Sequence, residues 1–482
     1  MTDQNQAMHQ RRKALILGLG ASGIACARHL AARGVVLSVA DTRLSPPFAD
    51  ALFQLCPEAE FVTGSLPSKL DPAVNMLVVS PGLSLYNGPS GELVRQARER
   101  GVPVVGEIEL FALELERLAR EEDYHPRVVA VTGTNGKTTT VTLLHTLLTA
   151  AGHEAALAGN VGPNVLDVLA SAASRKALPE VWVLELSSFQ LASTSTLAPD
   201  AAALLNITED HVDWHGSMQA YALDKARVFR HARHGVVNRD DEGTARLLAA
   251  TAIPAGPTFG SDEPVRAGDW GLVPDASGRT LLVRASGDGP VAFVHEDDLQ
   301  LAGRHNTLNV LAVLSLLDTL GVPLESVRKA LLGYKGEPHR VQPLFESGGV
   351  LFIDDSKGTN VGAVVAAVKG VFERGRRVLI VMGGDGKGQD FTPLKEALAG
   401  RSGGVALIGR DAPAIERALE GLDAPVKRFD GMAGAVTWLW SLASSGDAVL
   451  LSPACASWDM YRNYAERSED FTRCARTVTK ID

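Results

Sequence analysis

The stretch that decides the fold is "VVAVTGTNGKTTTVTLLHTLL", residues 128–148, in which an apolar strand leads through a glycine turn into a helix. The first turn of a helix leaves backbone N–H groups without partners, and such groups bind phosphate oxygens. Gly133 and Gly136 let the backbone approach a ligand closely. Lys137 is placed to contact the β- and γ-phosphates of a nucleotide, and the Thr138 hydroxyl to bind Mg²⁺. We therefore predict a nucleotide-binding loop here.

This loop is shorter than the usual P-loop. That motif has a glycine five residues before its second glycine, and here the position is taken by Val131. The alternative interpretation is an ordinary glycine turn beside a solvated lysine. Because the strand, the G-x-x-G-K-T pattern and the helix occur together, we favour the nucleotide site.

The segment before this loop predicts a Rossmann-like unit. A buried strand at residues 14–17 is followed by Gly18, Gly20 and Gly23 and by a helix, and a second strand ends at Asp41. This order of strand, glycine turn, helix, strand and terminal acid is typical of dinucleotide-binding folds. Alone it is weak evidence for a nicotinamide cofactor, and a purely structural turn is the alternative.

The rest of the chain predicts two more α/β units. "VWVLELSSFQL" and "AAALLNITEDH" are apolar strands that end in polar residues, as at the ligand-binding edge of a parallel sheet. Short alternating runs between about residues 260 and 300 indicate antiparallel strands, and strands alternate with helices again after a hinge at "GYKGEPHR". We therefore predict an α/β fold with three domains: a Rossmann-like domain at residues 1–124, a P-loop-type ATPase domain with a mostly parallel sheet at 125–338, and a Rossmann-like domain at 339–482.

Length and charge restrict the class of protein. The 482 residues suit roughly three domains of about 150 residues each. The net charge of −9 disfavours nucleic-acid binding. The N-terminus lacks the apolar region of a secretory signal, no apolar run has the length of a membrane span, and the four cysteines lack metal-ligand spacing. We expect a cytoplasmic enzyme with reduced thiols and with neither nucleic acid nor a membrane as partner.

Two strand ends could supply metal ligands. Glu185 and His211 each follow an apolar strand. A carboxylate oxygen suits Mg²⁺ well, whereas imidazole suits it less. The alternatives are a helix-capping role for Glu185 and a structural role for His211, and for an isolated histidine the structural role is favoured. Both residues should face the same sheet edge as the phosphate loop, which strengthens the case for metal binding.

Several motifs in order resemble one enzyme family. "TGTNGKTTT", "LELSSFQL", "NITEDH" and "LAGRHNTLN" together resemble the ATP-dependent Mur ligases. "DDSKGTN", "GGDGKGQDF" and "SPACASWDMYRNY" resemble the members that use D-glutamate, and the resemblance runs from Gly18 to Phe471. It implies ATP and Mg²⁺ as cofactors and UDP-N-acetylmuramoyl-L-alanine and D-glutamate as small-molecule substrates. The implied reaction forms an amide bond through an acyl phosphate, in the synthesis of a peptidoglycan precursor, and we expect a monomer.

The resemblance assigns the central site residue by residue. The positions that correspond to ATP-binding residues are Gly133, Thr134, Asn135, Gly136, Lys137, Thr138, Thr139, Asn309, Arg340 and Asp355. Thr138, Glu185 and His211 correspond to metal-site residues, and Lys225 to a lysine whose carbamate ligates or orients the metal. From the residues alone, Lys225 would be interpreted as a surface lysine. The expected catalytic residues are Lys137, His211, Lys225 and Arg340, with His211 only a candidate for the base that deprotonates the D-glutamate amine.

The resemblance also assigns both substrate sites. Residues that match contacts to the UDP-linked substrate are Ala21, Ser22, Asp41, Thr42, Arg43, Ser80, Pro81, Gly82 and Asn160. Residues that match contacts to D-glutamate are Lys357, Thr359, Lys387, Ser457 and Tyr464. Tyr464 stands where the family usually has Phe, and we still expect it to pack on the carbon chain of the ligand. Cys455 lies inside the last motif and is interpreted as a packing residue, because no base stands at a recognisable spacing.

Other functions of three kinds stay open on the sequence. A sister ligase could add a diamino acid, or the chain could be a folylpolyglutamate synthase, although "DTR" at 41–43 and "SPACAS" at 452–457 favour the D-glutamate enzyme. A nicotinamide-dependent dehydrogenase would explain the first glycine turn and leave the second unexplained. A nucleotide sensor without catalysis is the third, and the presence of Lys137, Glu185 and His211 argues against it.

Overall fold

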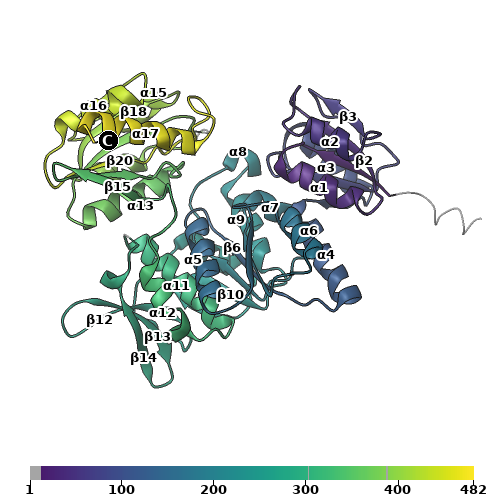
Figure 1. The fold of residues 1–482 in the computed structure, drawn as a ribbon, viewed down its shortest axis with the longest axis horizontal. Helices are drawn as coiled ribbons and strands as arrows, with labels where there is room; N and C mark the ends of the chain where they lie inside the picture. Colours follow the sequence, from purple (N-terminus) through teal and green to yellow (C-terminus); the bar gives the residue numbers. More distant parts are fainter. Residues whose placement is uncertain (1–11, 302, 387–388, 482) are drawn as a thin grey trace, which may run out of the picture.

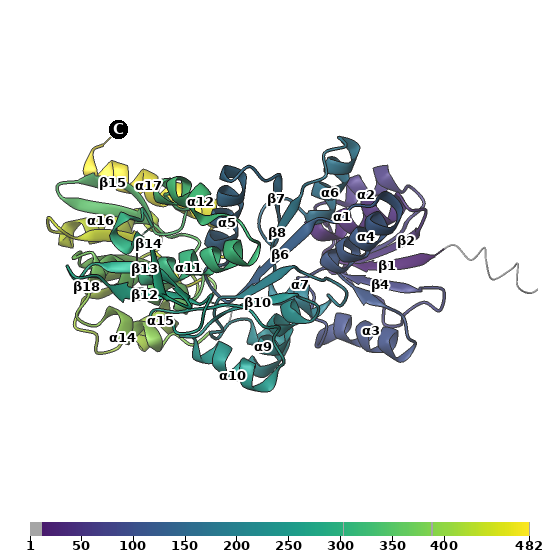
Figure 2. The ribbon, with the colours of Figure 1, turned by 90° about the horizontal axis from the view of Figure 1, so that it is seen from below.

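The structure is a computed structural model that describes residues 12–301, 303–386 and 389–481. This part of the chain forms three β-sheets with helices beside them, and the predicted α/β fold is confirmed. Figure 1 shows the first sheet (purple) and the third (yellow-green) on opposite sides of the central one, and Figure 2 shows the same order from below. Within these residues, no helix is both long enough and apolar enough to cross a membrane. The domain boundaries after residues 124 and 338 stay predictions.

The first sheet is parallel, with the strand order β3-β2-β1-β4-β5. Its strands are β1 (Lys13–Leu17), β2 (Val36–Asp41), β3 (Glu60–Thr63), β4 (Met76–Val79) and β5 (Val104–Val105). Its helices are α1 (Ala21–Ala31), α2 (Ala49–Leu55) and α3 (Gly88–Glu99). The predicted glycine turn connects β1 to α1. A Cβ added to Gly23 would lie 2.0 Å from the Gly18 carbonyl oxygen, so only glycine lets α1 pack this closely on the turn.

The central sheet has the order β14-β13-β12-β11-β10-β9-β6-β8-β7. Its strands are β6 (Arg127–Thr132), β7 (Ala155–Gly159), β8 (Val181–Glu185), β9 (Ala201–Leu204), β10 (His234–Asn238), β11 (Thr258–Phe259), β12 (Trp270–Pro274), β13 (Thr280–Ser286) and β14 (Gly289–His295). Its helices are α5 (Lys137–Ala150), α6 (Val165–Ser174), α7 (Ser188–Ala192), α8 (Val212–His215), α9 (Met218–Ala226), α10 (Glu242–Ala250), α11 (Arg304–Thr319) and α12 (Leu324–Gly333). Neighbouring strands pair in parallel along the part of the sheet with the order β12-β11-β10-β9-β6-β8-β7. By contrast, β12 pairs antiparallel with β13, and β13 with β14. The predicted antiparallel excursion is thus confirmed.

The third sheet has the order β15-β16-β20-β17-β18-β19. Its strands are β15 (Gln342–Ser347), β16 (Val350–Asp354), β17 (Val378–Gly383), β18 (Ser402–Ile408), β19 (Val426–Arg428) and β20 (Ala448–Leu451). Its helices are α13 (Val361–Glu373), α14 (Pro393–Leu398), α15 (Ala412–Ala418), α16 (Met432–Leu442) and α17 (Tyr464–Thr479). β15 runs antiparallel to β16, a pairing that the expected parallel pattern did not include.

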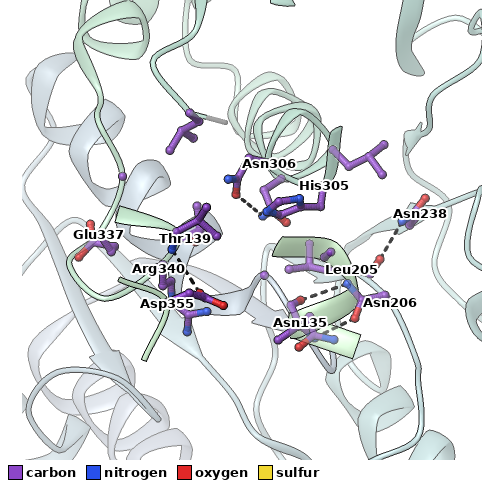
Figure 3. A pocket seen from close by; sticks show the side chains of 18 of the residues that line it. Asn135, Thr139, Leu205, Asn206, Asn238, His305, Asn306, Glu337, Arg340 and Asp355 are labelled. Carbon is purple, nitrogen blue, oxygen red and sulfur yellow. Dashed lines mark hydrogen bonds between the residues drawn. The ribbon is translucent and has the colours of Figure 1, made fainter. Parts of the chain in front are cut away.

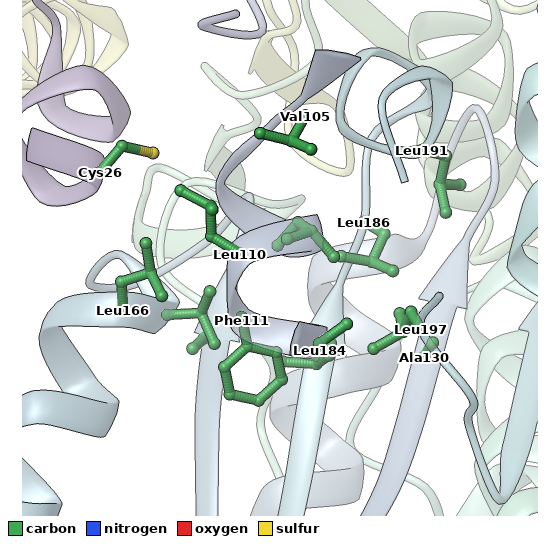
Figure 4. Close-up of a cluster of buried hydrophobic side chains, with 14 of the residues drawn as sticks. Cys26, Val105, Leu110, Phe111, Ala130, Leu166, Leu184, Leu186, Leu191 and Leu197 are labelled. Carbon is green, nitrogen blue, oxygen red and sulfur yellow. The ribbon is translucent and has the colours of Figure 1, made fainter. Parts of the chain in front are cut away.

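Helix α4 (Glu107–Glu122) joins the first sheet to the central one. Its Phe111 packs edge-on against Trp182 of β8, with ring centroids 4.9 Å apart. Figure 4 shows Phe111 beside Leu184 of the same strand, within a single buried cluster that also includes Cys26 of α1. Because burial of apolar area is the main favourable term in folding, this shared core ties the two sheets together.

Candidate active site

The predicted phosphate loop has the expected geometry. β6 ends at Thr132, the loop follows, and α5 begins at Lys137. Gly136 adopts a φ of +82°, in the left-handed region that favours glycine. A Cβ at this position would lie 2.3 Å from the Asn309 side-chain oxygen on α11. The loop therefore needs glycine both for its turn and for the close approach of Asn309, a predicted ATP-binding residue.

Lys137 lies at the start of α5 and points back over the loop. Its Nζ donates hydrogen bonds to the carbonyl oxygens of Gly133 at 2.8 Å and Thr134 at 2.7 Å. Burial lowers the pKa of its ammonium group, whereas nearby Glu185 and Asp210 act in the opposite direction. A lysine held over the loop in this way is placed to meet phosphate oxygens.

Glu185 lies at the carboxyl end of β8, directly opposite the loop. Its carboxylate accepts hydrogen bonds from the Thr138 hydroxyl at 2.8 Å and from the Asn160 amide at 2.7 Å. The cap of the next helix is Ser187, so Glu185 does not have the capping role considered as an alternative. Asn160, predicted near the UDP-linked substrate, therefore contacts Glu185, the carboxylate that is predicted to bind the metal. Hydroxyl and carboxylate oxygens are donors that suit Mg²⁺.

His211 precedes α8 with a φ of +54°. Its ring meets Phe189 edge-on at 4.6 Å, and its Nε2 lies 3.4 Å from an Asp210 carboxylate oxygen. Within residues 12–301, 303–386 and 389–481, no three His, Cys, Asp or Glu residues are grouped so as to hold a metal ion. A metal role for His211 stays a prediction.

Lys225 is buried, which corrects its interpretation as a surface lysine. Only 2% of its surface is exposed, and its Nζ donates to the Gly133 carbonyl oxygen at 2.8 Å. Burial, together with the nearby Lys137 charge, lowers its pKa well below the usual range. A lysine on a helix is usually exposed, and the burial of Lys225 depends on how α9 packs against the phosphate loop, which only the tertiary structure shows.

A pocket extends from the phosphate loop to α11 and to the start of the third domain (Figure 3). The predicted residues that line it are Asn135, Gly136, Thr139, Asn309, Arg340 and Asp355. Lining residues that the sequence analysis missed are Leu205, Asn206, Asn238, Phe259, Leu301, His305, Asn306, Leu308, Gly336, Glu337, Val341, Ala363 and Ala366. The signal that could have found Asn206, Asn238 and Phe259 is their position at or just after the carboxyl ends of β9, β10 and β11.

Arg340 reaches the central domain from the third. Its Nη2 donates to the Thr138 hydroxyl at 2.8 Å. A second contact across the same cleft, from the Asn360 amide to the Asn135 side-chain oxygen at 3.1 Å, was not predicted. Both contacts join residues more than 200 positions apart, and they place an arginine fork beside the loop that would hold the phosphates.

Asp355 is a buried carboxyl in the same pocket. Burial raises its pKa to about 7, although a hydrogen bond from the Ser452 hydroxyl and the charge of Arg340 act in the opposite direction. The Ser452 bond is 2.6 Å long, and the backbone N–H of Val341 donates to the other carboxylate oxygen at 3.2 Å. Asp355 thereby fixes the backbone that follows Arg340.

The residues assigned to the UDP-linked substrate lie at the carboxyl edge of the first sheet. Asp41 accepts hydrogen bonds from the backbone N–H of Leu19 at 2.6 Å and from the Arg43 guanidinium at 2.6 Å. Burial raises the pKa of Asp41, but these bonds outweigh it and hold the pKa at about 2. Ser80 donates to the Gly18 carbonyl at 2.8 Å, which joins the two turns. The other residues assigned to this substrate on the first sheet flank the same turns: Ala21, Ser22, Thr42, Pro81 and Gly82.

The described residues assigned to D-glutamate, Lys357, Thr359, Ser457 and Tyr464, lie on the third domain. Lys357 places its Nζ 5.3 Å from the centre of the Tyr464 ring, and Tyr464 meets His339 edge-on at 5.6 Å. Burial and the charge of Arg340 lower the pKa of Lys357. The backbone N–H of Thr359 donates to the Lys357 carbonyl oxygen at 3.0 Å. Ser457 is buried, and so is Cys455, which belongs to the same sequence motif. Lys387 lies outside the described residues.

Comparison with known proteins gives matches along most of the chain. Three family descriptions match in order: "Mur ligase MurD-like, N-terminal domain" at residues 12–106, "Mur ligase middle domain" at 131–317 and "Mur ligase, glutamate ligase domain" at 339–455. Proteins named UDP-N-acetylmuramoylalanine–D-glutamate ligase from Burkholderia pseudomallei (strain 668) and Burkholderia mallei (strain SAVP1) are each 46% identical over 496 residues, 97% of both chains.

Solved structures with the same fold are more distant in sequence. UDP-N-acetylmuramate-alanine ligase from Thermotoga maritima has a TM-score of 0.58 at 20% identity and covers 96% of this chain and 99% of its own. The MurF ligase from Thermotoga maritima in complex with ADP has a TM-score of 0.59 at 18% identity and covers 98% and 96%. At these identities the similarity concerns the fold alone.

Proposed function

Because the chain belongs to the Mur ligase family, we propose that its central pocket performs an ATP-dependent ligation of D-glutamate to UDP-N-acetylmuramoyl-L-alanine, with release of ADP. This step adds an amino acid to a peptidoglycan precursor. The observation that carries the proposal is the meeting of Lys137, Thr138 and Arg340 at one loop, with Arg340 supplied by the third domain. An ATP site that is completed only by another domain suits a transfer that must exclude water.

The first chemical step in this proposal makes an acyl phosphate. A carboxylate oxygen of the L-alanine end attacks the γ-phosphorus of ATP, and the bond from that phosphorus to the β-bridging oxygen breaks to release ADP. Negative charge then grows on the transferred oxygens. Lys137 and the Arg340 fork stabilise it, because preformed donors in a water-poor site cost little to reorganise.

The second step makes the amide. The D-glutamate amine attacks the acyl carbon. The bond from this carbon to the phosphate oxygen then breaks, and inorganic phosphate leaves. The amine must lose a proton, and His211 is the candidate base from the sequence. No covalent enzyme intermediate is needed, so positioning supplies most of the acceleration.

Magnesium is part of the proposal. The oxygen donors of Thr138 and Glu185, 2.8 Å apart, are the groups that would hold it, and they fit its preference for hard ligands. When bound, Mg²⁺ neutralises phosphate charge. Lys225 fits the proposed carbamylation, since its lowered pKa favours the neutral amine that can add CO₂. We further propose that the protein acts as a monomer in the cytoplasm, where ATP is available.

The proposal assigns the two substrates to different domains. We propose that the turns after β1, β2 and β4 bind the UDP portion, and that Lys357, Thr359, Lys387, Ser457 and Tyr464 bind D-glutamate. Lys357 supplies a cation for a substrate carboxylate. The two regions stand on opposite sides of the central sheet (Figure 1), and in this proposal the reacting ends of the two substrates meet over the phosphate loop.

Phosphate release tests the function directly. Purified protein is incubated with ATP, Mg²⁺ and UDP-N-acetylmuramoyl-L-alanine, and with D-glutamate, L-glutamate, L-lysine or diaminopimelate in parallel. We expect phosphate release with D-glutamate and with none of the other three amino acids. Release should be lost in Lys137→Ala and retained in the control Lys369→Ala. Lys369 is an exposed lysine whose Nζ lies 3.9 Å from a Glu373 carboxylate oxygen. Release that is indifferent to glutamate would indicate another ATPase. Activity with L-lysine or diaminopimelate in place of D-glutamate would indicate a sister ligase.

A further inference from the structure

A chain of hydrogen bonds outside the proposed mechanism connects the first domain to α9. Tyr86, in the loop before α3, donates its hydroxyl to a carboxylate oxygen of Asp224 at 2.7 Å. The same oxygen lies 2.8 Å from Nδ1 of His215, and Nε2 of His215 lies 3.0 Å from the Ser188 hydroxyl. We call these four residues, Tyr86, Asp224, His215 and Ser188, the interdomain relay.

The interdomain relay resembles a catalytic triad in connectivity but has no access to a substrate. Ser188 and Asp224 are each 2% exposed, and His215 is 3% exposed. With Nδ1 of His215 donating to Asp224, Nε2 of a neutral imidazole accepts from the Ser188 hydroxyl. A buried carboxylate is costly unless its oxygens are paired, and Arg227 adds a further donor to Asp224 at 2.9 Å. The relay is thus a satisfied network that holds elements in place.

Helix α9, which the interdomain relay holds through Asp224, also carries Lys225, a residue of the candidate active site. On α9, Asp224 directly precedes Lys225, whose Nζ donates to the Gly133 carbonyl oxygen at 2.8 Å. One turn earlier, the Tyr221 hydroxyl lies 2.9 Å from the Thr134 hydroxyl. α9 therefore contacts the phosphate loop through two residues and the first domain through Asp224.

Aromatic packing extends the same connection to His211. The Phe189 ring stacks on His215 with centroids 5.5 Å apart, and its edge meets His211 at 4.6 Å. Tyr86 packs edge-on against Trp214, which neighbours His215 on α8. A change in the position of Tyr86 would therefore reach both predicted metal-site residues, His211 and Lys225.

We propose that Tyr86 and Asp224 are positioning residues that hold α8 and α9, and through them His211 and Lys225, in the arrangement that catalysis requires when the first domain is docked. The inference rests on the proposed ligase function. Its consequence is that the Tyr86 hydroxyl, which touches no reacting atom, supports turnover. Within the part of the chain that the structure describes, no hydrogen bond or ring contact joins the D-glutamate region on the third domain to the relay, so the affinity for D-glutamate should not depend on the relay.

The test removes single polar atoms and compares turnover with stability. The variants are Tyr86→Phe, Asp224→Asn and the double variant, in the full chain. The control is Tyr124→Phe, because the Tyr124 hydroxyl also joins α4 to the central sheet, bonding Trp182 at 2.9 Å and Pro179 at 2.6 Å, away from the phosphate loop. Wild type, the variants and the control are assayed for kcat, for KM of each substrate and for Tm.

We expect Tyr86→Phe to lower kcat about tenfold, since hydrogen bonds to charged groups have large effects, with the KM for D-glutamate unchanged within about twofold. The double variant should lose no more than Asp224→Asn, because both changes break the same connection. Tyr124→Phe should keep the wild-type kcat even where its Tm falls.

Two results would overturn the inference while leaving the function standing. One is a wild-type kcat in Tyr86→Phe at saturating substrates; the other is a loss of kcat in Tyr124→Phe as large as that in Tyr86→Phe. If Asp224→Asn does not fold, the comparison of Tyr86→Phe with Tyr124→Phe decides. Absence of D-glutamate-dependent release in the wild type would instead refute the function.

Discussion

The buried carboxyl of Asp355 should make the protein less stable as pH rises through neutrality. Asp355 is 5% exposed, and burial raises its pKa from 3.8 to about 7. Between these two values the folded state binds a proton that the unfolded state has lost, so the free energy of unfolding falls with rising pH. The slope is about 1.4 kcal/mol per pH unit, which sums to about 2.5 kcal/mol between pH 5 and pH 8.

The matched comparison is Asp355→Asn against wild type. The variant lacks the titrating group, so its stability relative to wild type should increase by about 2.5 kcal/mol between pH 5 and pH 8. Asp447→Asn is the control in the same domain. Burial raises the pKa of Asp447, but the Arg377 guanidinium, 2.8 Å away, outweighs it and holds the pKa below 3.8. Asp447 is therefore ionised throughout this pH range in both states, and its variant should differ from wild type by a constant amount.

Equilibrium urea unfolding at pH 5, 6, 7 and 8, followed by circular dichroism, measures these differences. A difference between Asp355→Asn and wild type that stays constant over this range would refute the reasoning. It would mean that the Asp355 carboxyl ionises at its ordinary pKa, and that the pocket between the central and third domains is more solvated than its burial indicates.

Other expected outcomes concern the phosphate loop. Arg340→Ala, which removes the fork that reaches Thr138 at 2.8 Å, should lower kcat/KM for ATP about a hundredfold or more in the phosphate-release assay, with Tm nearly unchanged. Gly136→Ala should abolish ADP binding in calorimetry, because a Cβ there would lie 2.3 Å from Asn309, whereas Gly152→Ala, also at positive φ but in open space, should cost only stability. Removal of divalent cations with EDTA should stop phosphate release without unfolding the protein, and full activity in EDTA would contradict the proposed role of Mg²⁺.

Much of the site could be predicted because its signals are local. The glycine turn at 133–136 joins a strand to a helix within about twenty residues, and its geometry follows from glycine and from the start of the helix. Glu185 could be placed at the same sheet edge because apolar strands that end in polar residues are readable one strand at a time. The antiparallel strands β12 to β14 were likewise visible as short alternating runs.

The sequence by itself thus determined the three α/β units and the residue types of the candidate phosphate site, because these depend on neighbours a few positions away. Only the tertiary structure decided that Lys225 is buried under the phosphate loop, that Asn160 bonds Glu185, and that Arg340 reaches Thr138. The antiparallel pairing of β15 and the interdomain relay are likewise visible only in the tertiary structure. Each depends on how whole elements far apart in the chain pack together, and the burial that fixes this packing is a property of the assembled core.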